Sequence, residues 1–374
     1  MHTRRDVLTA AAATAALAAW SPLAAYAQPQ GHSPSPQGGP LPMNPPAKSG
    51  GRFRPPGRFG LGGVAIGTGF APLSAGQSDE VMKTAWDAGV RYFDTSPWYG
   101  LGLSERRMGH FLAGQNRDDY VLSTKVGRLM TATKNVPKVM WKAPSPFEFR
   151  IDYTADGTRR SIEDSLQRMG LARFDIVFIH DLSPDHFGEK WVEHFDVAAK
   201  GAIPTLTRLR EEGVIKGWGF GVNNVEPCLR ALEVADPDVF LLATQYSVVH
   251  HEQALNQLFP KCAERGASIV VGAPFNSGFL AGRERYNYRD AVPPAIREKG
   301  ARIAAIAKEH GTDLRTVALQ FCLAPPVVSA VIPGASTGRQ VIENALSVAT
   351  RLPADLWAAL KREKLIAENA PTPA

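Results

Sequence analysis

Residues 90–100 place an acid and a tyrosine where proton chemistry is possible. They read Val-Arg-Tyr-Phe-Asp-Thr-Ser-Pro-Trp-Tyr-Gly, so an apolar run ends in Asp94 and Tyr99 follows beside a glycine. This order is typical of a buried strand that runs into a loop. A tyrosine ionises near pH ~10, so it exchanges protons near neutrality only when a neighbouring cation lowers its pKa. The stretch therefore calls for a lysine at a second strand end.

Two later apolar runs end in groups that would complete such a site. Tyr-Val-Leu-Ser-Thr-Lys ends at Lys125, and Phe-Asp-Ile-Val-Phe-Ile-His ends at His180. We expect Lys125 to pair with Asp94 and to lower the pKa of Tyr99. His180 would orient or polarise the reacting oxygen. Alone, the acid could be a strand-end cap, the lysine a surface charge and the histidine a hydrogen-bonded core residue, but together they favour catalysis.

The elements that must position these residues alternate along the chain. Strand-like runs are followed by helical runs, which predicts an α/β protein with a parallel sheet closed into a (β/α)8 TIM barrel. The residues that end such strands converge on one mouth of the barrel. The predicted strands are 63–67, 91–94, 120–125, 174–180, 215–221, 239–243, 268–272 and 330–332. The predicted helices are 79–88, 104–113, 158–169, 203–212, 226–233, 253–265, 296–310 and 338–349, with Ser78 and Ser104 as expected N-caps of the first two.

An open doubly wound sheet is the alternative architecture. Gly60-x-Gly62-x-x-Ala65 matches the letters of the dinucleotide-binding fingerprint. That fingerprint should follow a strand and open a helix, whereas these residues follow a Pro/Arg-rich coil and run into an apolar stretch. Glycines at the mouth of a first barrel strand explain the match better.

Two connections, 126–157 and 182–200, are too long to be plain linkers. Both follow strand ends, so in a barrel they would overhang the face where sites are built. Trp141, Phe147 and Phe149 in the first connection could wall a substrate pocket or could only hold the loop in place.

Composition excludes several functional classes. The chain has 374 residues, of which 44% are hydrophobic and 21% charged, as is usual for a globular protein with a full core. The net charge of +6 comes from scattered basic residues, so no nucleic-acid partner is expected. The three cysteines, Cys228, Cys262 and Cys322, lie far apart without metal-ligand spacing, so neither a disulfide scaffold nor a metal site is expected. An oxidoreductase built on these residues would need a redox cofactor.

Residues 1–27 have the order of a twin-arginine signal peptide. Arg4 and Arg5 precede an Ala-rich apolar run, and Ala25-Tyr26-Ala27 predicts cleavage before Gln28. The run is too short and too weakly apolar to predict a membrane anchor. We expect the twin-arginine machinery to export the protein to the periplasm or beyond. The alternative is a chance arginine pair on a cytoplasmic protein.

The next segment, residues 28–56, contains nine prolines and five glycines. It cannot bury enough apolar surface to order itself, so a flexible linker is expected. The barrel domain would then occupy residues 57–374.

Residues 60–344 as a whole resemble the aldo-keto reductase superfamily. The resemblance lies in Phe93-Asp94-Thr95 through Tyr99-Gly100, Ser123-Thr124-Lys125 and Ile179-His180-Asp181, which match the segments of that family's catalytic tetrad. Ordered matches at successive strand ends are far more specific than any one of them. The resemblance implies a nicotinamide cofactor bound without a Rossmann motif, with Tyr99 as proton donor and acceptor.

The same resemblance implies a set of cofactor-binding residues. Asn223 and Gln245 would contact the carboxamide. A loop that wraps the pyrophosphate would contribute Pro274, Phe275, Asn276, Ser277 and Leu280, and the adenosine end would contact Gly334, Ser336, Gln340, Glu343 and Asn344.

Three positions depart from the family pattern. The aromatic residue that often stacks on the nicotinamide is replaced by Gly272. Gly334 and Gln340 stand where NADP-preferring relatives often carry cations, which favours NAD. Arg283 and Arg339 could still reach a 2′-phosphate, so NADP stays open.

Within the superfamily, Lys125-Val126-Gly127-Arg128-Leu129 and residues 149–157 and 175–181 resemble the aldose 1-dehydrogenase branch, which includes pyridoxal 4-dehydrogenase. This implies a sugar or similar aldehyde as substrate. Tyr99, as phenolate, would take the hemiacetal proton while hydride passes to the nicotinamide and a lactone forms. The alternatives are a general aldehyde or ketone reductase and, in another class, a non-catalytic nicotinamide-binding sensor or partner subunit.

The export hypothesis has a direct test. An Arg4→Lys/Arg5→Lys double variant should remain in the cytoplasm, because the twin-arginine pair is what the export machinery reads. Immunoblotting of periplasmic and cytoplasmic fractions measures this, and normal export of the variant would disprove the assignment.

Overall fold

The sheet at the centre of the fold contains eight parallel strands, as the alternating pattern predicts. The computed structural model describes residues 39–46 and 51–373. Parallel bridges from Phe59 to Val331 and from Gly62 to Gly334 join the first strand to the last and close the barrel. In sheet order the strands are β1 (Leu61–Gly62), β2 (Tyr92–Asp94), β3 (Val121–Val126), β6 (Ile176–His180), β7 (Gly217–Val222), β8 (Val239–Ala243), β9 (Ser268–Gly272) and β10 (Val328–Ile332).

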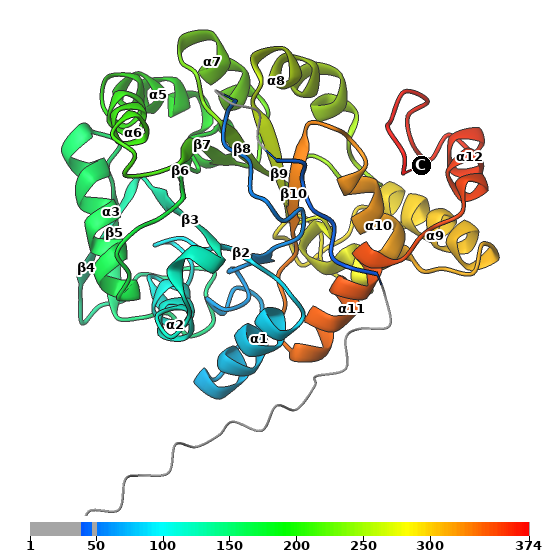
Figure 1. Cartoon of the computed structure of the whole chain (residues 1–374), viewed down its shortest axis with the longest axis horizontal. Helices are drawn as coiled ribbons and strands as arrows, with labels where there is room; N and C mark the ends of the chain where they lie inside the picture. The colour runs from blue at the N-terminus through cyan, green and yellow to red at the C-terminus, as the bar shows by residue number, and fades with distance from the viewer. Residues whose placement is uncertain (1–38, 47–50, 374) are drawn as a thin grey trace, which may run out of the picture. The chain divides into compact units, whose positions relative to one another are not determined.

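Helices surround the barrel (Figure 1). Where sequence supplies a cap, the helix begins at it: Thr154 and Thr337 each accept a backbone N–H of the first turn. The main helices are α1 (Ala75–Asp87), α2 (Leu103–Leu112), α3 (Ala155–Met169), α5 (Trp191–Lys200), α6 (Ala202–Glu211), α7 (Glu226–Val234), α8 (Phe259–Arg265), α9 (Pro294–Glu309), α10 (Leu314–Leu323), α11 (Gly338–Ala349) and α12 (Ala354–Arg362). Shorter turns are α4 (Pro184–Phe187), the 3₁₀ segments Arg117–Asp119, Gly188–Lys190 and Asn276–Ala281, and the π-helical segment Ala254–Leu258.

The alternation of side chains along a strand decides what faces the barrel interior. On β6, Ile176 and Phe178 belong to the apolar cluster inside the barrel, whereas Val177 and Ile179 pack against the helices. The next inward position is therefore His180.

The two neighbouring strands follow the same rule. On β2, Tyr92 faces inward and Phe93 outward, so Asp94 faces inward. On β3, Val121 faces inward and Leu122 outward, which turns Lys125 inward at the strand's end. Because side chains alternate with a period of two, Asp94, Lys125 and His180 all face inward at the same mouth of the barrel.

Several expected elements differ in the structure. The predicted strand 63–67 is a series of turns, and β1 is only Leu61–Gly62. Helices α4, α5, α10 and α12 were not predicted, and α4 and α5 occupy most of the connection 182–200 that was expected to be a long loop. Both expected N-caps are wrong. The N-cap of α1 is Ser74, which forms a capping box with Gln77, and Ser78 is buried inside the helix. The N-cap of helix α2 is Gly102, which has a positive φ of 84°. Ser104 therefore lies inside the helix and does not cap it.

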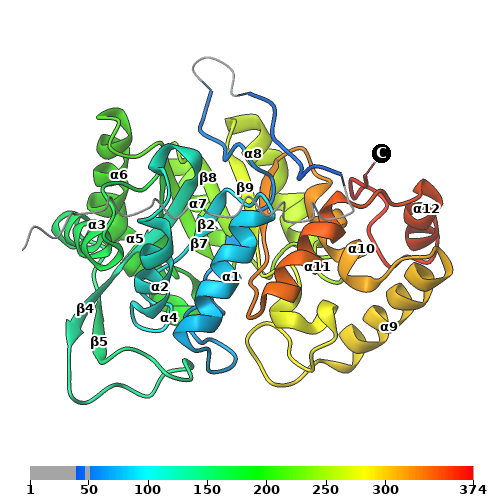
Figure 2. The same ribbon diagram turned by 60° about the horizontal axis from the view of Figure 1, so that its bottom comes forward.

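The connection 126–157 contains an antiparallel hairpin, β4 (Arg128–Ala132) and β5 (Phe147–Ile151), that the sequence did not reveal. It lies at the end of the barrel where β3 ends, as Figure 2 shows in its lower part. The expectation that this connection overhangs the mouth agrees with this placement.

Residues 39–46 and 51–56 pack on the opposite end of the barrel, where they form a strap (Figure 2, top). Met43 bridges to Gly57, and Asn44 Nδ2 donates 2.7 Å hydrogen bonds to the carbonyls of Pro55 and Ser329. Arg52 donates to the carbonyl of Arg265. Over these residues the expectation of a flexible linker is corrected, because backbone carbonyls of the barrel supply partners that the segment's own composition does not show. The predicted signal peptide, residues 1–27, lies outside the described residues.

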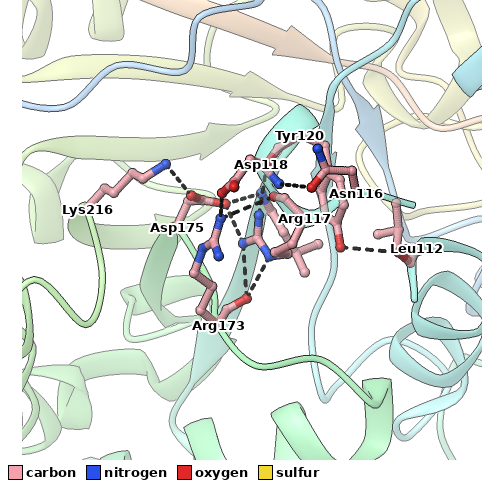
Figure 3. A network of polar contacts seen from close by, with 9 residues as sticks. Leu112, Asn116, Arg117, Asp118, Tyr120, Arg173, Asp175 and Lys216 are labelled. Carbon is pink, nitrogen blue, oxygen red and sulfur yellow. Dashed lines mark hydrogen bonds and ion pairs between the residues drawn. The ribbon is translucent and has the colours of Figure 1, made fainter. Parts of the chain in front are cut away.

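A network of charges also holds this end of the barrel (Figure 3). In the fully buried Asp175, Oδ2 accepts hydrogen bonds from Arg117 at 2.6 Å and from the backbone N–H of Leu122 at 2.9 Å, and Oδ1 forms an ion pair with Lys216 at 2.8 Å. These partners join the beginnings of β3, β6 and β7, at the opposite end of the strands from Asp94, Lys125 and His180. Within residues 39–46 and 51–373, no helix combines the length and apolar character that a membrane span requires.

Candidate active site

A buried ion pair forms the floor of the mouth. Lys125 Nζ lies 2.7 Å from Asp94 Oδ2, and both side chains are almost completely buried. Ser123 donates to the other carboxylate oxygen at 2.7 Å, and Lys125 donates a second bond, of 2.8 Å, to the carbonyl of Thr95. The predicted pairing of Asp94 with Lys125 is present, with each charge also hydrogen-bonded.

Tyr99 lies directly above this pair. Lys125 Nζ is 4.5 Å from the centre of the Tyr99 ring, and the His180 ring is 5.9 Å from it, centre to centre. The loop reaches this position because Leu101 and two flanking glycines adopt positive φ angles, and a Cβ on Gly67 would lie 2.7 Å from the Tyr99 carbonyl carbon. The four residues predicted from strand ends are therefore together.

Burial keeps the proton-exchanging groups in their neutral forms. It raises the pKa of Tyr99 well above its usual value, and the negative charge of Asp94 raises it further. It lowers the pKa of His180 well below its usual value, with the positive charges of Arg128 and Lys125 acting in the same direction. Tyr99 is thus a protonated phenol and His180 a neutral imidazole.

This result corrects one expectation. We expected Lys125 to bring the pKa of Tyr99 down, but the net effect of its surroundings is to raise it. The physical reason is that Lys125 is committed to Asp94 and Thr95 and meets the tyrosine over the ring face. The positive charge of Arg128 lowers the pKa of Tyr99 but does not overcome burial and the charge of Asp94.

The hairpin brings aromatic side chains to the same mouth. The Trp141 ring lies 5.8 Å from the Tyr99 ring, and Trp98 packs on Trp141 and Phe149 at 5.6 and 4.8 Å. Trp141 is only 5% exposed and packs on Tyr99, so it holds the loop in place, and its role as a pocket wall stays a prediction. Phe147 belongs to the same cluster.

Sequence reasoning missed Arg128. It is the first residue of β4, is almost fully buried, and lies 2.9 Å from Asp181 and 3.3 Å from His180 Nδ1. Its place three residues after Lys125 was the available signal, but nothing in the sequence shows that the chain turns back there.

A cavity of about 680 Å³ leads away from the catalytic residues. Asp94 and Tyr99 line one end, and residues of the β10–α11 connection line the other, including Ser336, Gln340 and Asn344. The N-terminal turn of α11 opens onto this far end, so its unpaired N–H groups favour an anion there. The volume and length suit a small molecule of dinucleotide size.

A profile of the aldo/keto reductase family matches residues 58–363, which is most of the chain. The chain belongs to the aldo/keto reductase family. It is 37% identical over 326 residues to D-threo-aldose 1-dehydrogenase of Pseudomonas sp., covering 84% of this chain and 95% of that protein. It is 35% identical over 324 residues to pyridoxal 4-dehydrogenase of Microbacterium luteolum, covering 82% and 94%. A solved aldo-keto reductase from Bacillus halodurans, in its holo form, superposes with a TM-score of 0.62 at 25% identity, covering 84% and 95%.

As an aldo/keto reductase, the protein is an NAD(P)-dependent oxidoreductase, and its cavity fits the cofactor. Most of the predicted contacts line this cavity: Pro274, Phe275, Ser277, Arg283, Gly334, Ser336, Gln340, Glu343 and Asn344. Arg285, also in the wall, has a buried Nε without a hydrogen-bond partner among the described residues, which suits a phosphate. When bound, the nicotinamide supplies or accepts the hydride.

Four predicted contacts do not line the cavity. Asn223 donates to Asp185 at 3.0 Å, and Gln245 donates a long, 3.4 Å bond to Thr244. Asn276 is buried, and its amide donates to Asn287 instead, while Leu280 is buried in the core.

Other residues of the cavity wall were not predicted. Phe70 comes from the first loop, and its ring lies 4.2 Å from the guanidinium of Arg285 across the opening. Tyr288 also lines the wall, so aromatic support is available although Gly272 has no side chain. Arg315 was missed because α10, on which it lies, was not predicted.

The Lys125 ammonium should set the pH dependence of alcohol oxidation. A tyrosine that serves as the base of alcohol oxidation must first lose its own proton, so we expect the rate to rise as pH passes through the pKa of Tyr99. Lys125→Met removes a cation beside the ring, which raises that pKa further and moves the rise to higher pH by about one unit or more. Rates at neutral pH should then fall about tenfold or more, as pH–rate profiles of kcat would show.

Two variants serve as controls for this change. Lys83→Met makes the same substitution at an exposed position on α1 and should leave the profile in place. Tyr99→Phe should abolish turnover while cofactor binding persists. A Lys125→Met enzyme that melts normally and keeps the wild-type profile would rule out Lys125 as the group that tunes Tyr99.

Proposed function

We propose that the protein oxidises the cyclic hemiacetal of an aldose, or of a similar hydroxylated aldehyde, to a lactone, with NAD as the preferred acceptor. The single observation that carries this proposal is the balance of charge at the catalytic mouth. Its charged side chains are matched in opposite pairs, and its two proton-exchanging groups are neutral. The similarity to an aldose and a pyridoxal dehydrogenase supports the same substrate class.

The charge balance favours an uncharged substrate. The Lys125 cation is neutralised by Asp94, and the Arg128 cation is neutralised by Asp181. Among the described residues, both cations beside Tyr99 and His180 are paired and so are both carboxylates, which leaves none of these four free for a charged group on the substrate. A neutral sugar ring carries no charge that would need an oppositely charged partner at this mouth.

The aromatic side chains at the mouth suit a ring with an apolar face. Trp98, Trp141 and Phe149 form a continuous cluster that borders Tyr99. A sugar presents C–H groups on its ring faces and hydroxyls at its edges, so an aromatic wall with polar groups at the base matches both.

The chain's own groups can carry the proton chemistry of this oxidation. Tyr99, in its phenolate form, takes the proton of the anomeric hydroxyl and becomes a neutral phenol, while the N–H of the neutral His180 holds the same oxygen in place. Lys125 stabilises the phenolate from which the oxidation starts. A nicotinamide held in the cavity would supply the hydride acceptor.

The adenosine end of the cavity supports NAD over NADP. Gln340 lies where a cation would hold a 2′-phosphate, and its Oε1 accepts the N–H and hydroxyl of Ser336. Arg315 and Arg339 both pair with Glu343, so their charges are already used. A 2′-phosphate would therefore meet less free positive charge than two nearby arginines suggest.

A paired substrate panel tests the reaction. With NAD, free aldoses should produce reduced nicotinamide absorbance and a lactone, whereas the corresponding methyl glycosides should not react, because their anomeric oxygen carries no proton to release. Both kinds of sugar have the same ring and charge, so the comparison isolates the hemiacetal. Rapid reduction of simple aldehydes with NADPH, without oxidation of any aldose, would favour the general reductase instead.

The cofactor preference has its own test. Gln340→Arg should improve kcat/KM for NADP about tenfold to a hundredfold, because a charge-assisted hydrogen bond contributes about 1.5–3 kcal/mol. Steady-state kinetics with NAD and NADP measure the ratio. Gln257→Arg adds the same charge at an exposed position outside the cavity wall, and it should not change the ratio of kcat/KM for NADP to that for NAD. If the wild type already uses NADP better than NAD, the preference proposed here is wrong.

A further inference from the structure

The guanidinium of Arg128 lies behind the catalytic histidine and not in the open cavity. Its Nη1 is 3.3 Å from His180 Nδ1, and its Nη2 is 2.7 Å from His186 Nε2 and 2.9 Å from Asp181. The planar group also lies 4.7 Å from the Trp98 ring centre. It is therefore held from several sides, with its charge compensated by Asp181.

These contacts decide which nitrogen of His180 carries the proton. A guanidinium can only donate hydrogen bonds, so the Nδ1 that faces it must accept. The second partner of Nδ1 is Ser96 Oγ at 3.1 Å, which already accepts the backbone N–H of Trp98 and so has its own hydrogen available to donate. A neutral imidazole with an accepting Nδ1 carries its proton on Nε2.

The surrounding charges hold the ring neutral. Burial lowers the pKa of His180 most, followed by the positive charges of Arg128, Lys125 and His186. The acidic group beside it is Asp181, whose Oδ1 lies 3.5 Å from Nε2 and whose charge is shared with Arg128. Tyr99, the remaining titratable group against the ring, is itself protonated.

We propose that Arg128 is a positioning residue that fixes His180 in the Nε2–H tautomer, so that the histidine presents a donor to the reacting oxygen. This inference rests on the role of His180 in the proposed function. It differs from a direct catalytic role, because Arg128 acts through the histidine and does not touch the substrate.

The chain around Arg128 ties this effect to the hairpin. Gly127, with a φ of 111°, lets the chain turn into β4, and a Cβ there would lie 2.3 Å from the Tyr153 ring. Tyr153, just after β5, donates a 2.7 Å bond to the carbonyl of His180. The hairpin therefore holds both the backbone and the imidazole of His180 while it carries the aromatic wall.

The tautomer can be measured directly by ¹⁵N NMR of histidine-labelled protein, with the His180 signals assigned by their loss in His180→Gln. In the wild type we expect the proton on Nε2 and no titration down to about pH 5.5, below the usual imidazole pKa of ~6.5. In Arg128→Met we expect a mixture of tautomers and a pKa for His180 higher by about one unit or more. The kcat/KM for the aldose should fall about tenfold, mainly through kcat.

Two further variants make the result decisive. Arg128→Met leaves Asp181 unpaired, so Arg128→Met/Asp181→Asn removes both charges and should show the same release of the tautomer if the single variant does not fold. Arg150→Met removes an exposed arginine from the same hairpin and should leave His180 unchanged.

The NMR readout separates this inference from the proposed function. If the wild type oxidises no sugar but the tautomer responds to Arg128 as expected, the substrate proposal fails and the positioning role stands. A wild-type proton on Nδ1 would overturn the inference. So would an unchanged tautomer and titration in both Arg128 variants, even with reduced kcat/KM.

Discussion

The ion pair between Asp94 and Lys125 is the interaction on which the site depends. Removing a charge from water at the end of an apolar barrel costs several kcal/mol, unless a close ion pair and hydrogen bonds compensate for the lost hydration. Here each charge has the other at 2.7 Å and a further hydrogen bond, from Ser123 to the carboxylate and from the ammonium to Thr95. The register that places Asp94 beside Ser123 is what makes this compensation possible.

The pair also marks a boundary inside the barrel. Below it, the inward positions are apolar, including Tyr92, Phe178 and Leu241, so water is excluded beneath the catalytic groups. Above it begins the cavity whose size and lining fit the cofactor. The opposite end of the barrel is covered by the Asp175 network and the strap (Figures 2 and 3). Polar groups therefore lie between an apolar interior and an open cavity only at the C-terminal ends of the strands, among the described residues.

The parts of this arrangement that depend on a period of two were readable from the sequence. Alternation along short apolar runs predicts the strands, and the residue that ends each run predicts the group at the mouth, which explains why Asp94, Lys125 and His180 were found. Contacts between segments distant in the chain were not readable. The hairpin carries few strong turn signals, and nothing in the sequence shows the direction of Arg128, two residues past β3. The strap is held in part by backbone carbonyls of Ser329 in β10 and Arg265 in α8, which are distant in the chain. The placement of Asn223 against Asp185 likewise depends on how two loops meet.

Charge balance has a consequence for how the site can respond to its ligands. Because Asp94 is paired with Lys125, Arg128 with Asp181, and His180 is neutral, the surroundings of Tyr99 carry little net charge. A phenol in such surroundings keeps its proton, since burial disfavours the phenolate and no excess cation opposes it. An added positive charge near the ring would then act with little screening, as it does in any low-dielectric site. The oxidised nicotinamide is such a charge. A nicotinamide cation bound near the ring would therefore lower the pKa of Tyr99 from the raised value that burial and Asp94 give it.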